Sequence, residues 1–146
     1  MPHAVTHVLI VIILLEIYRF YFVKDKKSFP IKYILIGAIA SLLPDMDIAL
    51  FYIMNFFGYS LQEIHRTFTH NLFIPLIFLI ISILFHQNKK FRNIFLIITF
   101  SIFMHLFLDA LISGGIAPFY PALKLSLGLN LLNIFPLEWR DTILPS

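Results

Sequence analysis

Histidine and aspartate are the residue types of this sequence whose spacing is suited to chemistry. The chain has no cysteine, so thiolate metal sites, disulfides and cysteine nucleophiles are excluded. Where thiolate is absent, neutral imidazole and carboxylate are the usual protein ligands of zinc and related divalent ions. Most of the histidines and aspartates gather in four short motifs, PHAVTH (2–7), LPDMD (43–47), HRTFTH (65–70) and HLFLD (105–109). These motifs predict a site for a divalent metal.

The composition of the chain places these polar motifs in an apolar environment. Hydrophobic residues make up 60% of the 146 residues and charged residues make up 13%. An ordinary soluble domain is about 45–50% apolar and about 25% charged. A water-soluble monomer and a disordered chain are therefore excluded, because there is too much apolar surface to leave in water. The length is that of one domain, 1–146.

Four apolar stretches are long enough, or nearly so, to cross a membrane as helices of about 20 residues. The first stretch lacks a basic leader and a small-x-small cleavage motif, so we expect it to be retained as an anchor. A tail of mixed composition, 114–146, follows the last stretch. The four predicted spans are 4–23, 31–57, 71–87 and 91–113.

The second span and the tail are expected to depart from straight helix. The second span has more residues than a straight crossing needs, and Pro44 disfavours helical backbone before it and removes a donor. In the tail, Leu123, Leu125, Leu127 and Leu129 alternate with other residues, and this period of two predicts a strand or an extended segment. The expected fold is an all-α integral membrane protein, a four-transmembrane-helix bundle with a kinked second helix and a short extended C-terminal tail.

The basic residues predict how the chain is oriented. Most of them lie in the loop between the first two spans and the loop between the last two: Lys24, Lys26, Lys27, Lys32, Lys89, Lys90 and Arg92. Loops rich in lysine and arginine face the cytoplasm. We therefore expect an integral plasma (inner) membrane protein whose termini face the extracytoplasmic side. The pI of about 9.3 then indicates contact with anionic lipid and not with nucleic acid.

Helical rise brings ionisable residues of separate spans to one depth. Counted from the basic ends of their spans, His7, Asp45, His70, His105 and Asp109 all lie about 21 to 27 Å away. This depth is in the outer third of the bilayer. His105 and Asp109 are four residues apart, so they share a helix face and can reach one ion. A hydrogen bond between helices is the alternative for His105 taken alone. The predicted ligands of one or two Zn²⁺ ions are His7, Asp45, Asp47, His65, His70, His105 and Asp109.

The order of the motifs resembles the YdjM-like family, a group of small prokaryotic inner-membrane proteins described as membrane-bound metal-dependent hydrolases. The resemblance covers most of the chain and implies a metal-dependent hydrolase. Ile48 departs from the family pattern, which often has histidine there, and so removes one possible ligand. Smaller departures are Thr67, Asn71 and Ile112. The matching residues are Thr6–His7, 43–47, 65–70, 105–111, Gly115 and Pro121.

A weaker resemblance in residue order links the chain to zinc-dependent phospholipase C and the related single-strand nucleases. It implies that Asp109 bridges two ions, that His7 serves one ion, and that His65 or His70 serves the other together with His105. These enzymes cleave phosphodiesters, so the resemblance implies phosphoester chemistry.

The expected function is that of a membrane-embedded metal-dependent phosphoesterase acting on a lipid or lipid-linked phosphate. Metal-activated water would attack the phosphorus. Asp45 or Asp47 would hold the water or act as general base, and Arg66 would stabilise charge on the phosphoryl oxygens. The alternatives are a metal-binding or metal-transporting membrane protein without hydrolytic activity, a structural membrane subunit, and a metal-free lipid phosphatase.

Overall fold

The computed structural model describes residues 4–58, 69–112, 115–123, 125–129 and 131 of the chain. Within this part, the secondary structure is helical, and one isolated antiparallel bridge takes the place of a strand. The all-helical expectation is therefore confirmed. The helices are α1 (Ala4–Tyr21), α2 (Ile31–Ala40), α3 (Met46–Met54), the short 3₁₀ helix η1 (Asn55–Phe57), α5 (Phe73–Leu84) and α6 (Lys89–Ile112).

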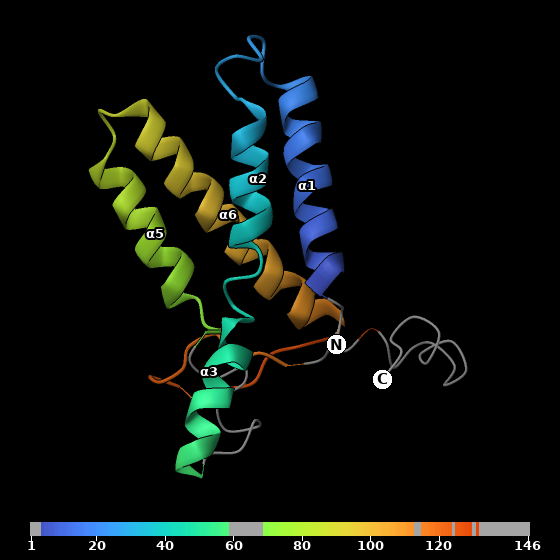
Figure 1. The fold of residues 1–146 in the computed structure, drawn as a ribbon, viewed down its shortest axis with the longest axis vertical. Helices are drawn as coiled ribbons and strands as arrows, with labels where there is room; N and C mark the ends of the chain where they lie inside the picture. Colours follow the sequence, from blue (N-terminus) through green and yellow to red (C-terminus); the bar gives the residue numbers. More distant parts are fainter. Residues whose placement is uncertain (1–3, 59–68, 113–114, 124, 130, 132–146) are drawn as a thin grey trace.

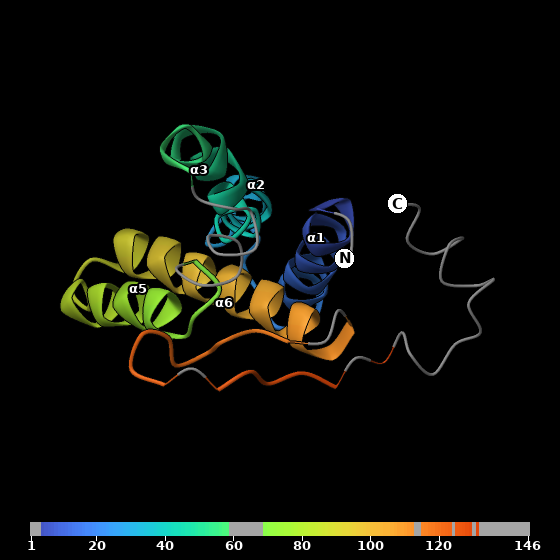
Figure 2. The ribbon, with the colours of Figure 1, turned by 90° about the horizontal axis from the view of Figure 1, so that it is seen from below.

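The helices form two antiparallel pairs, α1 with α2 and α5 with α6, and α3 extends beyond the end of the bundle (Figures 1 and 2). Two described helices, α1 with 18 residues and α6 with 24, are long and apolar enough to cross a membrane. The other two apolar helices, α2 with 10 residues and α5 with 12, are shorter than the spans predicted there.

The third predicted span is shortened because polar side chains set the ends of the helices. Asn71 Oδ1, just before the N-cap residue Leu72, accepts hydrogen bonds from the backbone N–H groups of Phe73 (3.0 Å) and Ile74 (3.3 Å), which have no partner within α5. Pro75 follows in the first turn, where a missing donor costs little. At the other end, Asn88 Oδ1 accepts from Phe91 N (3.3 Å) at the start of α6. The helix therefore covers Phe73–Leu84 instead of 71–87.

The second predicted span is broken where its sequence indicates. Pro44 has no N–H to donate to Ala40, so α2 ends at Ala40 and the chain continues through tight turns to α3. In these turns, Asp45 N donates to Leu42 O (3.1 Å) and not to Ser41 O, its partner in a regular helix. The carbonyl of Ser41 is thereby released from the helical hydrogen-bond pattern.

Close packing of three helices holds the bundle together between the basic end and this break. Gly37 of α2 lies against α1 and α6, and a Cβ there would overlap Leu15 Cδ1 and lie 3.1 Å from Ser101 Oγ. Glycine therefore permits the helices to approach so closely. Two buried apolar groups form the interior: Val11, Leu15, Phe29, Tyr33, Ile34 and Ile97 in one, and Ile102, Leu106 and Ile116 in the other.

The tail returns to the bundle as an extended segment. Ile116 and Leu127 exchange two backbone hydrogen bonds of 3.0 and 2.9 Å, and Leu129 N donates to Ala110 O (2.8 Å) near the end of α6. Pro118 O accepts from Leu72 N (2.9 Å), which joins the tail to the segment before α5. The tail thus connects the start of α5 to the end of α6, on the side of the bundle where the polar motifs lie.

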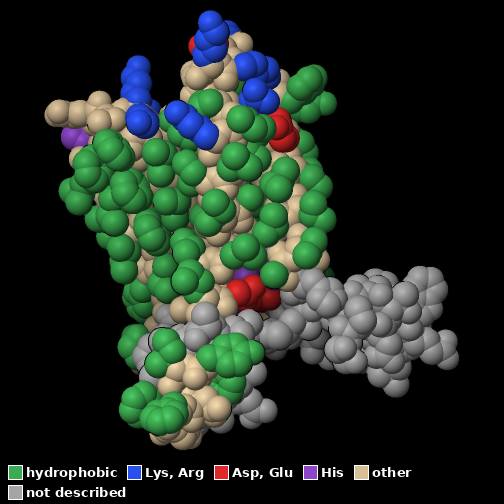
Figure 3. All heavy atoms as spheres, viewed as in Figure 1, with side chains coloured by type: hydrophobic (Ala, Val, Ile, Leu, Met, Phe, Trp, Pro, Cys, Tyr) green, Lys and Arg blue, Asp and Glu red, His purple; other side chains and the backbone are tan. Residues whose placement is uncertain are grey.

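Lysine and arginine side chains gather at the opposite end of the molecule (Figure 3). The α1–α2 loop and the α5–α6 loop lie at the same end of the bundle (Figure 1), as the orientation prediction requires. Between this basic end and the polar motifs, the face of the bundle seen in Figure 3 is mostly hydrophobic.

Candidate metal centre

Six histidine and aspartate side chains converge where α2 breaks, although they come from four separate parts of the chain. His7 lies near the start of α1, Asp45 and Asp47 flank the start of α3, His70 precedes α5, and His105 and Asp109 lie on α6. All are buried except Asp45, which is partly exposed. The sequence-based expectation that these motifs share one depth therefore agrees with their contact in space.

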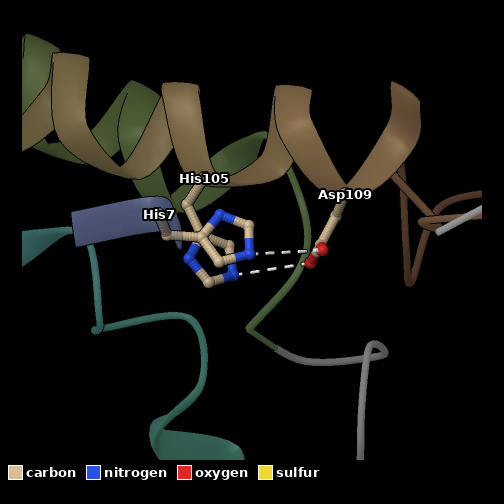
Figure 4. A group of neighbouring side chains, drawn as sticks. All are labelled: His7, His105 and Asp109. Carbon is tan, nitrogen blue, oxygen red and sulfur yellow. Dashed lines mark ion pairs between the residues drawn. The ribbon is translucent and has the colours of Figure 1, made fainter. Parts of the chain in front are cut away.

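The contacts between imidazole nitrogens and carboxylate oxygens are longer than good hydrogen bonds. His70 Nε2 lies 3.7 Å from Asp45 Oδ1 and 3.3 Å from Asp109 Oδ2. His105 Nε2 lies 3.4 Å from each of the same two oxygens. His7 Nε2 lies 3.6 Å from the other oxygen of Asp109, Oδ1 (Figure 4).

Such spacing is that of ligands arranged around an ion. Metal–ligand bonds of about 2.0–2.1 Å in a tetrahedron place neighbouring ligand atoms about 3.3–3.4 Å apart. Two overlapping groups have ligand atoms within 4.8 Å of one another: His7, His105 and Asp109, and Asp45, His70 and His105. His105 belongs to both groups, and the two oxygens of Asp109 face different histidines.

The orientation of His105 is set by the broken helix. Its Nδ1 lies 2.6 Å from the Ser41 carbonyl oxygen, which is the carbonyl released by the break after α2. A carbonyl can only accept, so Nδ1 carries the proton and donates it. The lone pair of Nε2 therefore points toward Asp45 and Asp109. A backbone carbonyl behind an imidazole in this way is one of the usual outer partners of a metal-binding histidine.

His70 is oriented in a similar manner by a side-chain pair. Thr69 Oγ1 donates to Asp47 Oδ2 (2.8 Å), and this carboxylate oxygen lies 3.3 Å from His70 Nδ1. Thr69 Oγ1 is itself 3.1 Å from the same nitrogen. Asp47 therefore faces the outer nitrogen of His70, whereas Asp45 faces the inner one. This arrangement of carboxylate, histidine and ligand position is a known way to increase the basicity of a metal ligand.

The ring of His7 lies flat against the ring of His105, with centroids 3.9 Å apart and planes inclined by 20° (Figure 4). Two protonated rings at this distance would repel each other strongly in a buried site. The stacking therefore requires that at least one of the two rings is neutral, and neutral imidazole is the form that binds metals.

The donor set fits a divalent cation. In the described part of the chain, His105 Nε2, which faces Asp45 and Asp109, is a buried nitrogen without a hydrogen-bond partner. Asp45, Asp47 and Asp109 bring three carboxylates into the same small volume, and burial of that charge is costly unless a cation balances it. Imidazole nitrogen with carboxylate oxygen is a donor combination that suits zinc and similar ions.

The structure brings together five of the seven predicted ligands and places a sixth, Asp47, behind His70. His65 lies outside the described residues, as does Arg66. Two contributors were not singled out from the sequence, the Ser41 carbonyl and the Thr69 hydroxyl. The position of Pro44 three residues after Ser41 is the signal for the first, because proline frees carbonyls in the preceding turn. Thr69 carries no comparable signal.

Thr69→Val is expected to weaken metal binding by about 10–100-fold, the usual cost of removing an outer partner. Valine keeps the shape of the side chain but leaves Asp47 and His70 without the hydroxyl. Competition with a chelator of known affinity measures the change in purified protein. Thr99→Val is the matched control, because Thr99 Oγ1 bonds only its own helix at Phe95 O in the described structure. Equal metal affinity in the two variants would contradict the role given to Thr69.

Comparisons with known proteins agree with the membrane character of the chain. No curated protein and no solved structure matches it. A family model, described as YdjM inner membrane protein, matches residues 1–144. That match includes every element of the His/Asp cluster and nearly the whole sequence. The chain therefore belongs to the YdjM family of inner membrane proteins.

Proposed function

We propose that this protein is a membrane-embedded metal-dependent hydrolase whose substrates are phosphoesters of lipids or of lipid-linked groups. The observation that supports it best is the uneven exposure of the cluster. The Asp45 side chain is 23% exposed, whereas that of Asp109 is 4% exposed and those of His70 and His105 are fully buried. Structural metal sites are closed on all sides, and catalytic sites keep one position open.

The residues of the cluster have distinct proposed roles. His7, His70, His105, Asp45 and Asp109 would hold one or two ions, with zinc as the expected metal. An ion of this kind supplies Lewis acidity toward a phosphoryl oxygen and acidifies water at neutral pH. Within the cluster, a water or a phosphate group that enters reaches Asp45 first, so this carboxylate is the proposed base.

Two further residues complete the proposal. Asp47 acts through His70, whose outer nitrogen it faces, and not on the substrate. Arg66 remains the predicted partner of the phosphoryl oxygens, because a guanidinium binds them in a bidentate manner. It lies outside the described residues, so its role stays a prediction.

The proposed membrane arrangement has four spans: α1, the pair α2 and α3, α5, and α6. Both basic loops lie at one end of the bundle (Figure 3), and such loops face the cytoplasm in inner-membrane proteins. The cluster then lies toward the extracytoplasmic side. Lipid is the nearest source of substrate for a site at this depth.

Metal transport is a second candidate, and the break between α2 and α3 favours it. Transporters commonly build ion sites from discontinuous helices near the middle of the bilayer. Uptake of Zn²⁺ into vesicles that contain the protein, without release of phosphate from any lipid, would support transport over hydrolysis.

Asp45→Asn tests the hydrolytic proposal. The amide keeps the size of the carboxylate but cannot accept a proton, so phosphate release from a panel of lipid phosphates should fall by about 100-fold or more. Assays use the metal-loaded protein in nanodiscs. Asp25→Asn, in the exposed loop at the basic end, is the control and should keep wild-type turnover. A metal-loaded wild-type protein that cleaves no phosphoester in the panel would refute the proposal.

A further inference from the structure

A groove of about 270 Å³ lies between α1 and α6, in the half of the bundle nearer the basic end. The two helices meet at the opposite end, where the rings of His7 and His105 stack, and they diverge toward the basic end (Figures 1 and 2). The groove fills the space that this divergence opens. Its floor is made of three buried apolar side chains, Leu15, Phe29 and Ile97.

Lipid is the medium that surrounds this groove. The helices that form it, α1 and α6, are the two described helices long and apolar enough to cross a membrane, and the chain belongs to a family of inner membrane proteins. The rims are exposed at Tyr18 of α1 and at Leu96 and Phe100 of α6. Phe100 lies 11 residues from Lys89, the first residue of α6, which is about 16 Å along the helix axis. The hydrocarbon core is about 30 Å thick, so the groove extends over the depth of one leaflet.

One amide side chain interrupts the apolar lining. Asn93 lies in the α6 wall of the groove and is partly buried, and its side chain makes no hydrogen bond to any residue that the structure describes. An amide without a partner in an apolar environment costs free energy, so a polar group of a ligand is expected beside it. In a phospholipid, ester carbonyls that accept hydrogen bonds lie between the phosphate and the acyl chains. Asn93 is four residues, about 6 Å, further into the membrane than Lys89.

Two lysines extend the groove face of α6 to the basic end. Lys89, Asn93, Leu96 and Phe100 are separated by 4, 3 and 4 residues, which is the period of one helix face. Lys90 is three residues before Asn93 and therefore borders the same face. Both lysines are exposed. Positive charge at the membrane surface, next to an apolar groove, complements a lipid whose headgroup is negative.

We propose that the groove between α1 and α6 is a binding site for an anionic phospholipid of the leaflet at the basic end. One acyl chain lies along the apolar floor, the ester groups lie beside Asn93, and the phosphate lies at Lys89 and Lys90. A zwitterionic phospholipid carries its own cation beside the phosphate, so the lysines favour lipids with a net negative charge. The groove shares no residue with the His/Asp cluster. This lipid is therefore a ligand distinct from the proposed substrate, and the proposal does not rest on hydrolysis.

Native mass spectrometry of the full-length protein in a neutral detergent tests the headgroup. The protein is titrated with phosphatidylglycerol and with phosphatidylcholine of the same acyl chains. We expect one phosphatidylglycerol to bind at least tenfold more tightly than phosphatidylcholine. Lys89→Gln together with Lys90→Gln should weaken phosphatidylglycerol binding by about 10- to 30-fold. Equal affinities of the unmodified chain for the two lipids would overturn the proposal.

A second double variant separates a specific site from general attraction to a basic surface. Lys27→Gln together with Lys32→Gln removes the same charge from the exposed basic residues around the start of α2. Its affinity for phosphatidylglycerol should stay within about twofold of that of the unmodified chain, because Lys32 belongs to a helix that does not line the groove. An equal loss in the two double variants would also overturn the proposal.

Leu96→Trp tests the place of the acyl chain. The larger side chain replaces one on the exposed rim and fills part of the groove without entering the buried core, so it should weaken phosphatidylglycerol binding by about tenfold or more. Ile13→Trp, on the exposed surface of α1 outside the groove, is the matched control and should bind as the unmodified chain does. Unchanged affinity in Leu96→Trp would mean that the acyl chain lies elsewhere.

A second copy of the chain is the other possible occupant of the groove, and the same spectra detect it. A complex of two chains that Leu96→Trp dissociates, with lipid binding unchanged, would show a protein contact in the groove and would overturn the proposal. Failure of the hydrolysis assay would leave all of these measurements unaffected, so the two ideas fail separately.

Discussion

Replacing His105 with alanine is expected to abolish stoichiometric metal binding. His105 Nε2 is shared by both groups of potential ligands, and no other described side chain belongs to both. The loss in affinity should exceed the roughly 10–100-fold that removal of an outer partner costs. The change also removes the ring on which His7 stacks. Elemental analysis of protein purified in detergent measures the result, with one or two equivalents of a divalent metal expected for the unmodified chain.

His86→Ala is the matched control for His105→Ala. His86 is exposed in the loop between α5 and α6, at the basic end, and its ring Nδ1 lies 3.2 Å from the Ile83 carbonyl oxygen. Its replacement should leave the metal content unchanged. Equal metal content in the two variants, with both folded by circular dichroism, would mean that His105 is not a ligand.

Removal of metal is expected to destabilise the folded protein by several kcal/mol. A metal present at 100 times its dissociation constant stabilises the native state by about 2.7 kcal/mol, and at 1,000 times by about 4.1 kcal/mol. Loss of the cation also leaves Asp45, Asp47 and Asp109 close together, and their mutual repulsion adds to the effect. The melting temperature in detergent, before and after treatment with a chelator, measures the difference.

Comparison with His105→Ala makes this measurement specific. The variant should melt at a lower temperature than the unmodified chain, and a chelator should change its melting temperature little. Addition of Zn²⁺ in excess should restore the stability of the unmodified chain only. A melting temperature of the unmodified chain that is the same with and without chelator would contradict a metal that is part of the fold.

The residues of the site were predictable because burying ionisable side chains in an apolar chain costs free energy. Histidine and aspartate in a 60% hydrophobic sequence must be buried for a reason, and helical rise alone placed five of them at one depth. The helical fold, the break at Pro44 and the extended tail also follow from local rules: apolar runs, a missing donor and a period of two. These features depend on residues near one another in the sequence.

The roles of the individual residues depended on contacts between distant parts of the chain. Asp45 and Asp47 are two residues apart and chemically identical, so the sequence could not distinguish them. Only the turn after α2 decides that Asp45 faces the inner nitrogen of His70 while Asp47 faces the outer one. In the same way, the Ser41 carbonyl is 64 residues from His105, and a backbone group has no sequence signature.

The sequence by itself thus determined the helical, membrane-embedded character of the protein and the types of residue that meet in the His/Asp cluster. Both follow from the composition and from the short-range geometry of a helix, which every window of the chain carries. Only the tertiary structure decided which carboxylate oxygen faces which imidazole nitrogen, and that Asp45 is the partly exposed member of the cluster. Those choices arise from the packing of four separate segments, and contacts of that kind are not encoded in any one of them.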